Sequence, residues 1–355
     1  MPLSIFDTYY MLGQIQEIVP AQTFFRDRYF PTGAEDVFAA DKVLVEYEDG
    51  DRRLAPFVVR RAGDIPIARG GYEVHEFEPP YIAPSRLLTL DDLRRRGFGE
   101  AVLPTITQAE RATALQLRDL TALDLRITRR EEWMAAQTLI MNGCEMRAFI
   151  DNKDDAEIYD VFYYDTSGSN PAMYTVANTW DSPGGDFWAD VEAMCADLAD
   201  RGLAATDLVV GSAVGNFILD DEKAMKRLDN RRMEFGQYAP RIESPGAAWL
   251  GRLNFGGFEL DIFSVRESYV DVDGTSKLFF PAKSALVTAP GCGRMMYGQV
   301  TQIEEDNEFH TFAMSRVPKF VADREKDTRK LRLASRPLAA PRQKAPWMYA
   351  ADVLS

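Results

Sequence analysis

The pattern of hydrophobic and polar positions predicts one long helix in the first half of the chain. Residues 105–142 contain no glycine or proline, while Pro104 precedes them and Gly143 follows them, as is typical of the two ends of a helix. At 1.5 Å per residue such a helix would be about 57 Å long, more than the width of a small domain. One continuous helix is the favoured interpretation, and two helices with a break near Thr121 or Thr128 are the alternative.

Alternating apolar and polar residues predict three β-hairpins. Residues 42–61 form two β-rich runs around Asp49-Gly50, a pair that readily adopts the positive φ angles of a tight turn. The acidic turn DNKDD, residues 151–155, separates the runs CEMRAFI and AEIYDVFYYD. Asp273-Gly274 supplies a further turn pair within a β-rich stretch.

The middle third of the chain alternates strands and helices. Asp186 can cap a helix that ends at Gly202, and the β-run DLVVG, residues 207–211, follows it. A further helix is expected over roughly residues 213–228. This alternation predicts an independent α/β domain.

The two ends of the chain give weaker patterns. Residues 4–19 carry apolar side chains at helical spacing after a start that resembles a capping box, so a short helix is expected there. Residues 300–355 are less regular, with two short β candidates, FHTFAMS and PWMYAADVL. The basic stretch 319–344 is interpreted as a surface that faces solvent or another subunit.

The segment RGGYEVHEFEPPYIAPS, residues 69–85, has an unusual composition. Its prolines exclude a helix and its glycine pair allows unusual backbone angles, so the segment is expected to run extended. Its aromatic side chains cannot all turn inward on one small sheet. They need a covering surface, either in the same domain or in a second copy of the chain.

Composition places the chain among globular proteins. It has 355 residues, of which 46% are hydrophobic, enough for two or three domains. The three cysteines are far apart, so neither a zinc knuckle nor a disulfide framework is expected. The sequence shows no apolar run of the roughly 18 residues that a membrane span requires, and no basic start of a secretion signal. Synthesis in the cytoplasm is the expectation.

The formal charge of −14 argues against a protein whose main task is to grip nucleic acid. Tight binding depends on neutralising phosphates with positive side chains, which this chain does not have in excess. The charge is compatible with a surface that confines DNA without binding it tightly.

The search for catalytic and metal-binding motifs gives no strong candidate. His75-Glu76 begins like the zinc motif H-E-x-x-H, but Pro79 stands where the second histidine would be. Residues 211–215, GSAVG, lack the lysine of a phosphate-binding loop, and residues 271–275, DVDGT, resemble a hairpin turn more than a calcium loop. We therefore expect no catalytic residues, no cofactor and no metal, although the abundance of carboxylates leaves an acidic hydrolytic site open.

Four segments together resemble one family. FFRDRYFPTGAEDVF, RGG followed by EFEPPYIAP, KAMKRLDNRR, and YVDVDGTSKLFFPAKSALV are similar, in this order, to stretches of the lambda-type major capsid proteins, the capsid protein E family. The resemblance covers about Phe24 to Leu354 and is weakest after Pro318.

The resemblance implies an α+β fold of the Hong Kong 97 type, which tailed-phage capsids share with bacterial encapsulins. It divides the chain into an N-terminal arm at 1–30, an extended β-hairpin loop at 31–90, a peripheral domain at 91–179 with a spine helix at 105–142, an axial α/β domain at 180–316, and a return to the peripheral domain at 317–355. The last strand, near Trp347 to Leu354, would lie in the peripheral domain.

The function implied is that of a structural protein without enzymatic activity. Subunits would assemble into hexamers and pentamers of an icosahedral phage shell around double-stranded DNA, in the host cytoplasm and without a membrane. Expected partners are a scaffolding protein and a portal, with a decoration protein as a further candidate. The alternatives are an encapsulin-like cellular compartment and an acidic β-rich protein that binds or hydrolyses carbohydrate through Asp271 and Asp273.

The extended loop and the proline-rich segment would form the assembly interface. The residues inferred for it are Asp49, Gly50, Arg52, Arg53, Gly70, Gly71, Tyr72, Phe77, Pro79 and Tyr81.

Overall fold

The computed structural model describes most of the chain. The described residues are 23–48, 72–89, 92, 108–148, 157–163, 172–221, 236–244, 246–271, 273–304, 306–323 and 328–355. The short helix predicted over residues 4–19 lies outside them. Among the described residues, no helix combines the length and the hydropathy that crossing a membrane requires.

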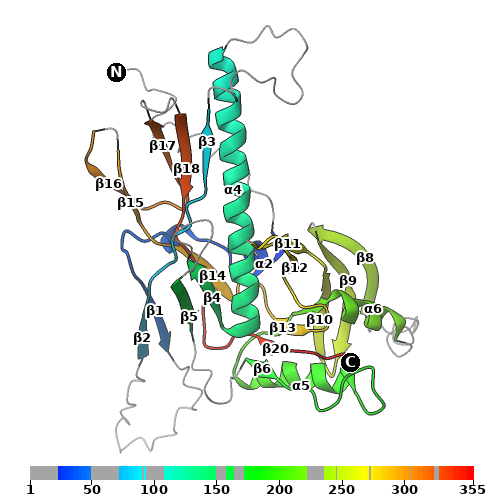
Figure 1. The fold of residues 1–355 in the computed structure, drawn as a ribbon. Helices are drawn as coiled ribbons and strands as arrows, with labels where there is room; N and C mark the ends of the chain where they lie inside the picture. The colour runs from blue at the N-terminus through cyan, green and yellow to red at the C-terminus, as the bar shows by residue number, and fades with distance from the viewer. Residues whose placement is uncertain are drawn as a thin grey trace, which may run out of the picture.

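The long helix α4 (Gln108–Met141) runs without a break for 34 residues and dominates the fold (Figure 1). The continuous helix is therefore confirmed, and the alternative with a break near Thr121 or Thr128 is wrong. Within the helix, the Thr121 hydroxyl donates to the carbonyl oxygen of Leu117, 3.0 Å away, one turn earlier.

Several strands outside the large sheet contact α4. β17 (Val317–Asp323), β18 (Thr328–Ala334) and β3 (Ser85–Leu88) form a three-stranded antiparallel sheet. β14 (Gly293–Tyr297) pairs with β19 (Pro337–Pro341), β15 (Val300–Ile303) with β16 (Phe309–Phe312), and β4 (Gly143–Ala148) with β5 (Glu157–Phe162). The β4–β5 pair confirms the two predicted runs of the second hairpin, whose turn lies outside the described residues.

The basic stretch 319–344 is more ordered than the sequence suggested. Three strands, β17, β18 and β19, take up most of it, although only a solvent-facing or subunit-facing surface was predicted. In β18 the side chains of Leu331 and Leu333 are buried against the Leu120, Leu123 and Ile127 stripe of α4. Lys330, just before them, is exposed, and Arg332, between them, is half-buried, as the two-residue period of a strand requires.

A seven-stranded mixed sheet forms the second part of the molecule. Its strands lie in the order β6 (Met173–Tyr174), β20 (Met348–Ala350), β13 (Ala285–Thr288), β7 (Asp207–Gly211), β10 (Phe258–Val265), β9 (Ala247–Phe255), β8 (Gly236–Ser244). Helices α5 (Phe187–Asp200) and α6 (Ser212–Asp220) pack against it. The predicted alternation of strands and helices is thus seen here, including the cap of α5, where the Asp186 carboxylate accepts from the backbone N–H of Trp188 and Ala189.

Two assignments near the C-terminus need correction. The last strand was predicted to return to the part that holds the long helix, but β20 pairs with β13 and β6 in the seven-stranded sheet. All three residues of β20 are buried, which suits a strand with neighbours on both sides. Conversely, β14 pairs with β19 and not with that sheet, although it was predicted within the axial stretch 180–316.

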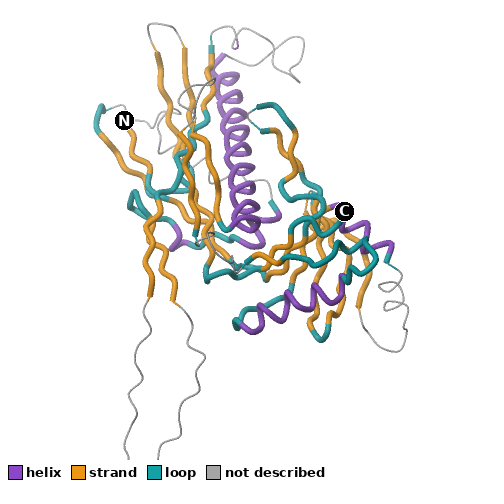
Figure 2. The backbone as a smooth tube through the Cα atoms, turned by 60° about the horizontal axis from the view of Figure 1, so that its bottom comes forward, coloured by secondary structure: helices purple, strands orange, loops and turns teal. Residues whose placement is uncertain are grey.

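Two hairpins project from this framework. β11 (Ser268–Val270) and β12 (Ser276–Leu278) pair across the predicted Asp273-Gly274 turn, where Gly274 has a φ of 82°. β1 (Val43–Glu48) and β2 (Tyr72–Phe77) form an antiparallel arm that leads away from α4 in both views (Figures 1 and 2). The predicted extended course of the proline-rich segment is confirmed for β2.

The register of the arm fixes how its strands pair. Glu48 at the end of β1 lies opposite Tyr72 at the start of β2. The sequence predicted that β1 pairs across a tight turn at Asp49-Gly50, but its residues pair with β2 instead. The predicted turn at Asp49-Gly50 lies outside the described residues.

Gly211 makes a tight junction between β7 and α6, where the sequence offered only a weak likeness to a phosphate loop. A Cβ atom there would lie 2.2 Å from the carbonyl oxygen of Pro281 and 2.4 Å from that of Ala282. We expect Gly211→Ala to lower the free energy of unfolding by about 1–3 kcal/mol, because two backbone segments must move apart. Urea denaturation of dissociated subunits measures the change. Gly274→Asn is the control, since that site is open and asparagine tolerates positive φ; equal losses would contradict the steric explanation.

Candidate assembly framework and its buried ionic network

The short helix α2 (Phe24–Tyr29) lies between α4 and the seven-stranded sheet. The side chains of Phe24, Phe25, Tyr29 and Phe30 are buried, with exposed fractions of 3% or less. They pack with residues of α4, of β14 and of the large sheet in one continuous core. The two arginines of α2 leave this core in different directions, Arg26 toward α4 and Arg28 toward the sheet.

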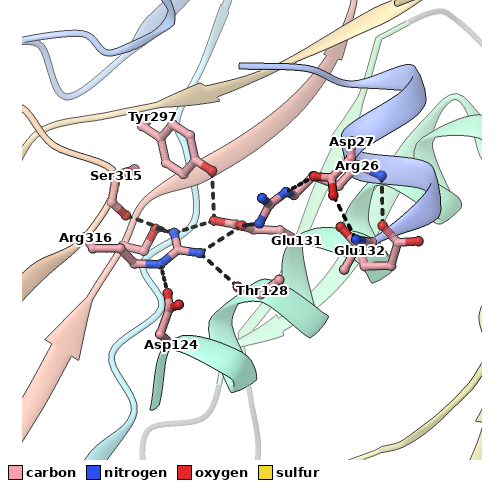
Figure 3. A network of polar contacts seen from close by, with 11 residues as sticks. Arg26, Asp27, Asp124, Thr128, Glu131, Glu132, Tyr297, Ser315 and Arg316 are labelled. Carbon is pink, nitrogen blue, oxygen red and sulfur yellow. Dashed lines mark hydrogen bonds and ion pairs between the residues drawn. The ribbon is translucent and has the colours of Figure 1, made fainter. Parts of the chain in front are cut away.

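A buried carboxylate on α4 is the centre of the polar network (Figure 3). Glu131 has no exposed surface, and its two oxygens accept hydrogen bonds from Arg316 at 2.6 and 2.9 Å. Arg26 donates to the same carboxylate at 3.0 Å, and so does the hydroxyl of Tyr297. Bidentate arginine pairing of this kind combines charge with a fixed geometry. It holds three separate chain segments to α4.

The N–H donors of Arg316 are themselves nearly all hydrogen-bonded. Its Nε donates to the Asp124 carboxylate at 2.7 Å, and its Nη2 contacts the hydroxyl of Thr128 at 3.3 Å. Burial alone would lower the pKa of Arg316, but the charge and hydrogen bonds of Glu131, together with Tyr297 and the charge of Asp124, outweigh burial and raise it. The guanidinium therefore stays charged at every pH at which the protein folds.

A second carboxylate, that of Glu132, holds the start of α2. Its oxygens accept from the backbone N–H groups of Phe25 and Arg26, each at 2.8 Å. These donors would otherwise be unsatisfied at the first turn of the helix. Burial raises the pKa of Glu132 to about 7, and the two backbone hydrogen bonds reduce that rise.

The opposite side of α2 is fixed to the large sheet through Asp207 at the start of β7. Arg28 Nε lies 2.6 Å from the Asp207 carboxylate, and the Tyr29 hydroxyl donates to the same oxygen at 3.0 Å. The Arg28 guanidinium also stacks on Phe263 of β10, 4.4 Å from the ring centre. Burial, followed by the charge of Asp207, raises the pKa of Tyr29 well above its usual value.

The base of the β1–β2 arm is held by one arginine. Arg336 donates to the carbonyl oxygen of Pro79 at 3.2 Å, to the Asp41 carboxylate at 3.0 Å and to the Glu78 carboxylate at 3.3 Å. Asp41 precedes β1, whereas Glu78 and Pro79 follow β2. Both strands of the arm are therefore clamped at the same point, on the chain between β18 and β19.

Four of the ten residues inferred for the assembly interface can be located. Tyr72 begins β2, Phe77 packs edge-on against Tyr163 with ring centres 5.0 Å apart, and Pro79 is buried. Tyr81 is 53% exposed. These two aromatic residues thus differ in exposure: Phe77 is partly covered by its own chain, whereas the side chain of Tyr81 is exposed. The other six, Asp49, Gly50, Arg52, Arg53, Gly70 and Gly71, lie outside the described residues.

The buried network was missed at the sequence level, although α4 carries one signal for it. Leu120, Ile127 and Met134 mark an apolar stripe at seven-residue spacing, and Glu131 falls in that stripe where an apolar residue is expected. A carboxylate in such a position needs a buried cation. Nothing in the sequence identifies Arg316, 185 residues further on, as that cation.

The acidic residues considered for carbohydrate chemistry stabilise their own hairpin. Asp271 lies 2.6 Å from Lys277 Nζ, and Asp273 accepts from the backbone N–H and the hydroxyl of Thr275. These contacts are those of a turn, and they give the carbohydrate alternative no support.

Comparison with known proteins gives a family and a fold. The sequence model of the family described as phage major capsid protein E matches residues 7–351. A structure described as a candidate capsid protein of a prophage from E. coli CFT073 aligns with a TM-score of 0.67 at 14% identity, covering 97% of this chain and 98% of that one. A phage-related protein from Bordetella bronchiseptica RB50 aligns with a TM-score of 0.51 at 12% identity, covering 97% of each. The search of curated proteins found no match.

Removing the cation of the network should destabilise the subunit strongly. Arg316→Met leaves Glu131 and Asp124 buried without their partner, and we expect the free energy of unfolding to fall by about 3–5 kcal/mol. Chemical denaturation of dissociated subunits measures this loss. Arg252→Met is the matched control because its ion pair with Asp261 is half-exposed, and about 1 kcal/mol or less is expected. Similar losses in both variants would show that the network does not carry the stability assigned to it.

Glu132 should make subunit stability depend on pH. Its pKa is about 7 in the folded chain against a usual 4.5, so between these values the folded state binds a proton that the unfolded state does not. Stability from this group is therefore greatest at low pH and falls as pH rises from about 4.5 to about 7. Thermal midpoints of dissociated subunits should show this fall, and Glu132→Gln should reduce it.

Glu259→Gln, at an exposed position, should leave the slope of the midpoint against pH unchanged. An identical slope for wild type and Glu132→Gln would refute the assignment to this carboxylate.

Proposed function

The chain belongs to the phage major capsid protein E family, and we propose that its subunits form the hexamers and pentamers of an icosahedral shell around double-stranded DNA. The family match over residues 7–351 carries this proposal, because it spans both parts of the fold. The predicted α+β capsid fold is confirmed, and the chain is a shell-forming structural protein of the virion capsid. We further propose that the chain has no catalytic role.

The β1–β2 arm supports assembly through contacts between copies. Its base is well anchored, since Val43 and Val45 are buried and Arg336 clamps both strands. Beyond the base the arm leads away from the body of the subunit (Figures 1 and 2). We assign it to the extended loop of the capsid fold, α4 to the spine helix, and the seven-stranded sheet to the axial domain. Repeated contacts of such arms around a closed lattice slow dissociation even when each contact is modest.

The partners proposed for this shell follow from its role. A scaffolding protein would guide curvature, a portal would occupy one vertex, and a decoration protein is a further candidate. The net charge of −14 suits a wall that encloses DNA without sequence-specific binding. Synthesis and assembly are placed in the host cytoplasm.

Electron microscopy of the expressed protein tests the proposal. Wild-type subunits, with a lysate of the native host, should give rings of five and six or closed polyhedral particles. Exclusively monomeric wild type would contradict the shell function.

A loop-replacement variant tests the arm in the same experiment. Replacing residues 49–71 by Asn-Gly joins the paired Glu48 and Tyr72 through a tight turn and keeps the register of the arm. We expect an unchanged thermal midpoint but about tenfold fewer particles, because the part that reaches a neighbour is gone. Particle yield equal to wild type would show that the loop is not required for assembly.

A further inference from the structure

One face of α4 carries a row of arginines that bind no carboxylate within the described part of the chain. Arg126, Arg129 and Arg130 follow one another at helical spacing with Trp133, and Arg126 and Arg129 are exposed. Together with Tyr269 and Val270 of β11 they line a groove of about 690 Å³ between α4 and the β11–β12 hairpin. We call it the arginine groove.

The floor of the arginine groove is held in place by contacts across it. Trp133 Nε1 donates to the Tyr269 hydroxyl at 3.0 Å, so α4 and β11 are joined at this point. Arg130 lies over the Trp133 ring, 4.9 Å from its centre, and Tyr269 packs on Phe279 at 4.9 Å. The groove is thus a prepared surface of aromatic side chains with guanidinium groups at its edge.

The acidic residues near the groove do not neutralise it. Asp271 lines the groove, but its carboxylate lies 2.6 Å from Lys277. Glu267 is half-buried, and its charge is felt by Arg129 without an ion pair between them within the described residues. The exposed guanidinium groups of Arg126 and Arg129 therefore present positive charge on a chain whose net charge is strongly negative.

The tip of the β15–β16 hairpin has the complementary chemistry. Asp306 and Glu308 are exposed at this tip, with Glu304 beside them. The Asp306 carboxylate also lies 2.7 Å from His310 Nε2 of the same hairpin, whereas Glu308 has no ion pair among the described residues. On the adjoining strands Phe309 is 75% exposed and lies opposite Ile303, which is 41% exposed. A large apolar pair next to carboxylates is typical of an anchor for a partner surface.

We propose that the acidic tip of the β15–β16 hairpin in one copy binds the arginine groove of the next copy. The hairpin and the β11–β12 side of α4 lie on opposite sides of that helix in both views (Figures 1 and 2), so the contact joins two copies. Asp306 and Glu308 pair with Arg126 and Arg129, and Phe309 covers Trp133 and Val270. Because two different surfaces meet, the contact is head-to-tail, the kind that forms a ring when the rotation from copy to copy closes. This inference rests on the proposed shell function.

Charge reversal and charge exchange test the pairing. Arg126→Glu with Arg129→Glu, and separately Asp306→Arg with Glu308→Arg, should each reduce particle yield about tenfold at unchanged thermal midpoint. Subunits that carry all four substitutions should recover yield to within about twofold, because opposite charges face each other again. Wild-type yield from either reversal, or no recovery in the fourfold variant, would overturn the proposal.

Disulfide trapping gives a readout that does not need closed shells. The native thiols of Cys144, Cys195 and Cys292 are buried, and burial raises the pKa of each to about 12, so they resist oxidation. Val270→Cys and Phe309→Cys subunits, mixed and treated with oxidised glutathione, should form a covalent pair. Arg118→Cys, exposed on α4 outside the groove, replaces Val270→Cys as the control and should form none.

The outcomes separate the inference from the proposed function. Wild-type particles without a trapped Val270→Cys and Phe309→Cys pair would overturn the contact and leave the shell function standing. Absence of wild-type particles would contradict the function itself. Single-stranded DNA binding that falls in the arginine variants, without trapping, would assign the groove to nucleic acid instead and overturn the proposal.

Discussion

The buried charge of Glu131 is the constraint on which the arrangement of the subunit depends. A carboxylate without solvent is tolerated only when several donors meet it in fixed positions. Here those donors come from α2, from β14 and from the chain before β17, all of which are distant in sequence from α4. Each donor must be in place for the others to be satisfied, so the network specifies one relative position for these segments, which apolar packing alone would define less sharply.

Helix α2 extends that constraint to the second part of the molecule. It is too short to be stable by itself, and its first backbone donors are held by Glu132. Arg26 and Arg28 point to carboxylates in the two different parts, Glu131 on α4 and Asp207 on β7. The six residues of α2 therefore set the orientation between the long helix and the large sheet. A shell subunit needs that orientation to be constant, because small angular errors accumulate around a closed ring.

The elements that could be predicted from sequence are those whose signals are local. The ends of α4 and α5 are marked by proline, glycine and a capping aspartate, and the β4–β5 and β11–β12 hairpins are marked by their turns. The predictions that failed concern strand pairings between segments that are far apart in the sequence. β20 resembled a strand, but only its partners β13 and β6 show to which sheet it belongs. In β18 the basic side chains masked the alternation of Leu331 and Leu333, and the family resemblance was weakest there.

The charged residues in the middle of α4 divide by sign between two faces of the helix. Its inward face contains Asp124, Glu131 and Glu132, neutralised inside the subunit by arginines and backbone donors, whereas its open face presents Arg126 and Arg129. The acidic residues that would ordinarily balance those arginines along the helix are thus already bound. A chain with a net charge of −14 consequently keeps a small positive surface beside an aromatic floor. Like-charged copies repel one another over most of their surface. A small positive surface of this kind therefore favours contact between particular faces of two copies. The same buried carboxylates that hold the subunit rigid therefore leave α4 with the charge that allows copies to recognise each other.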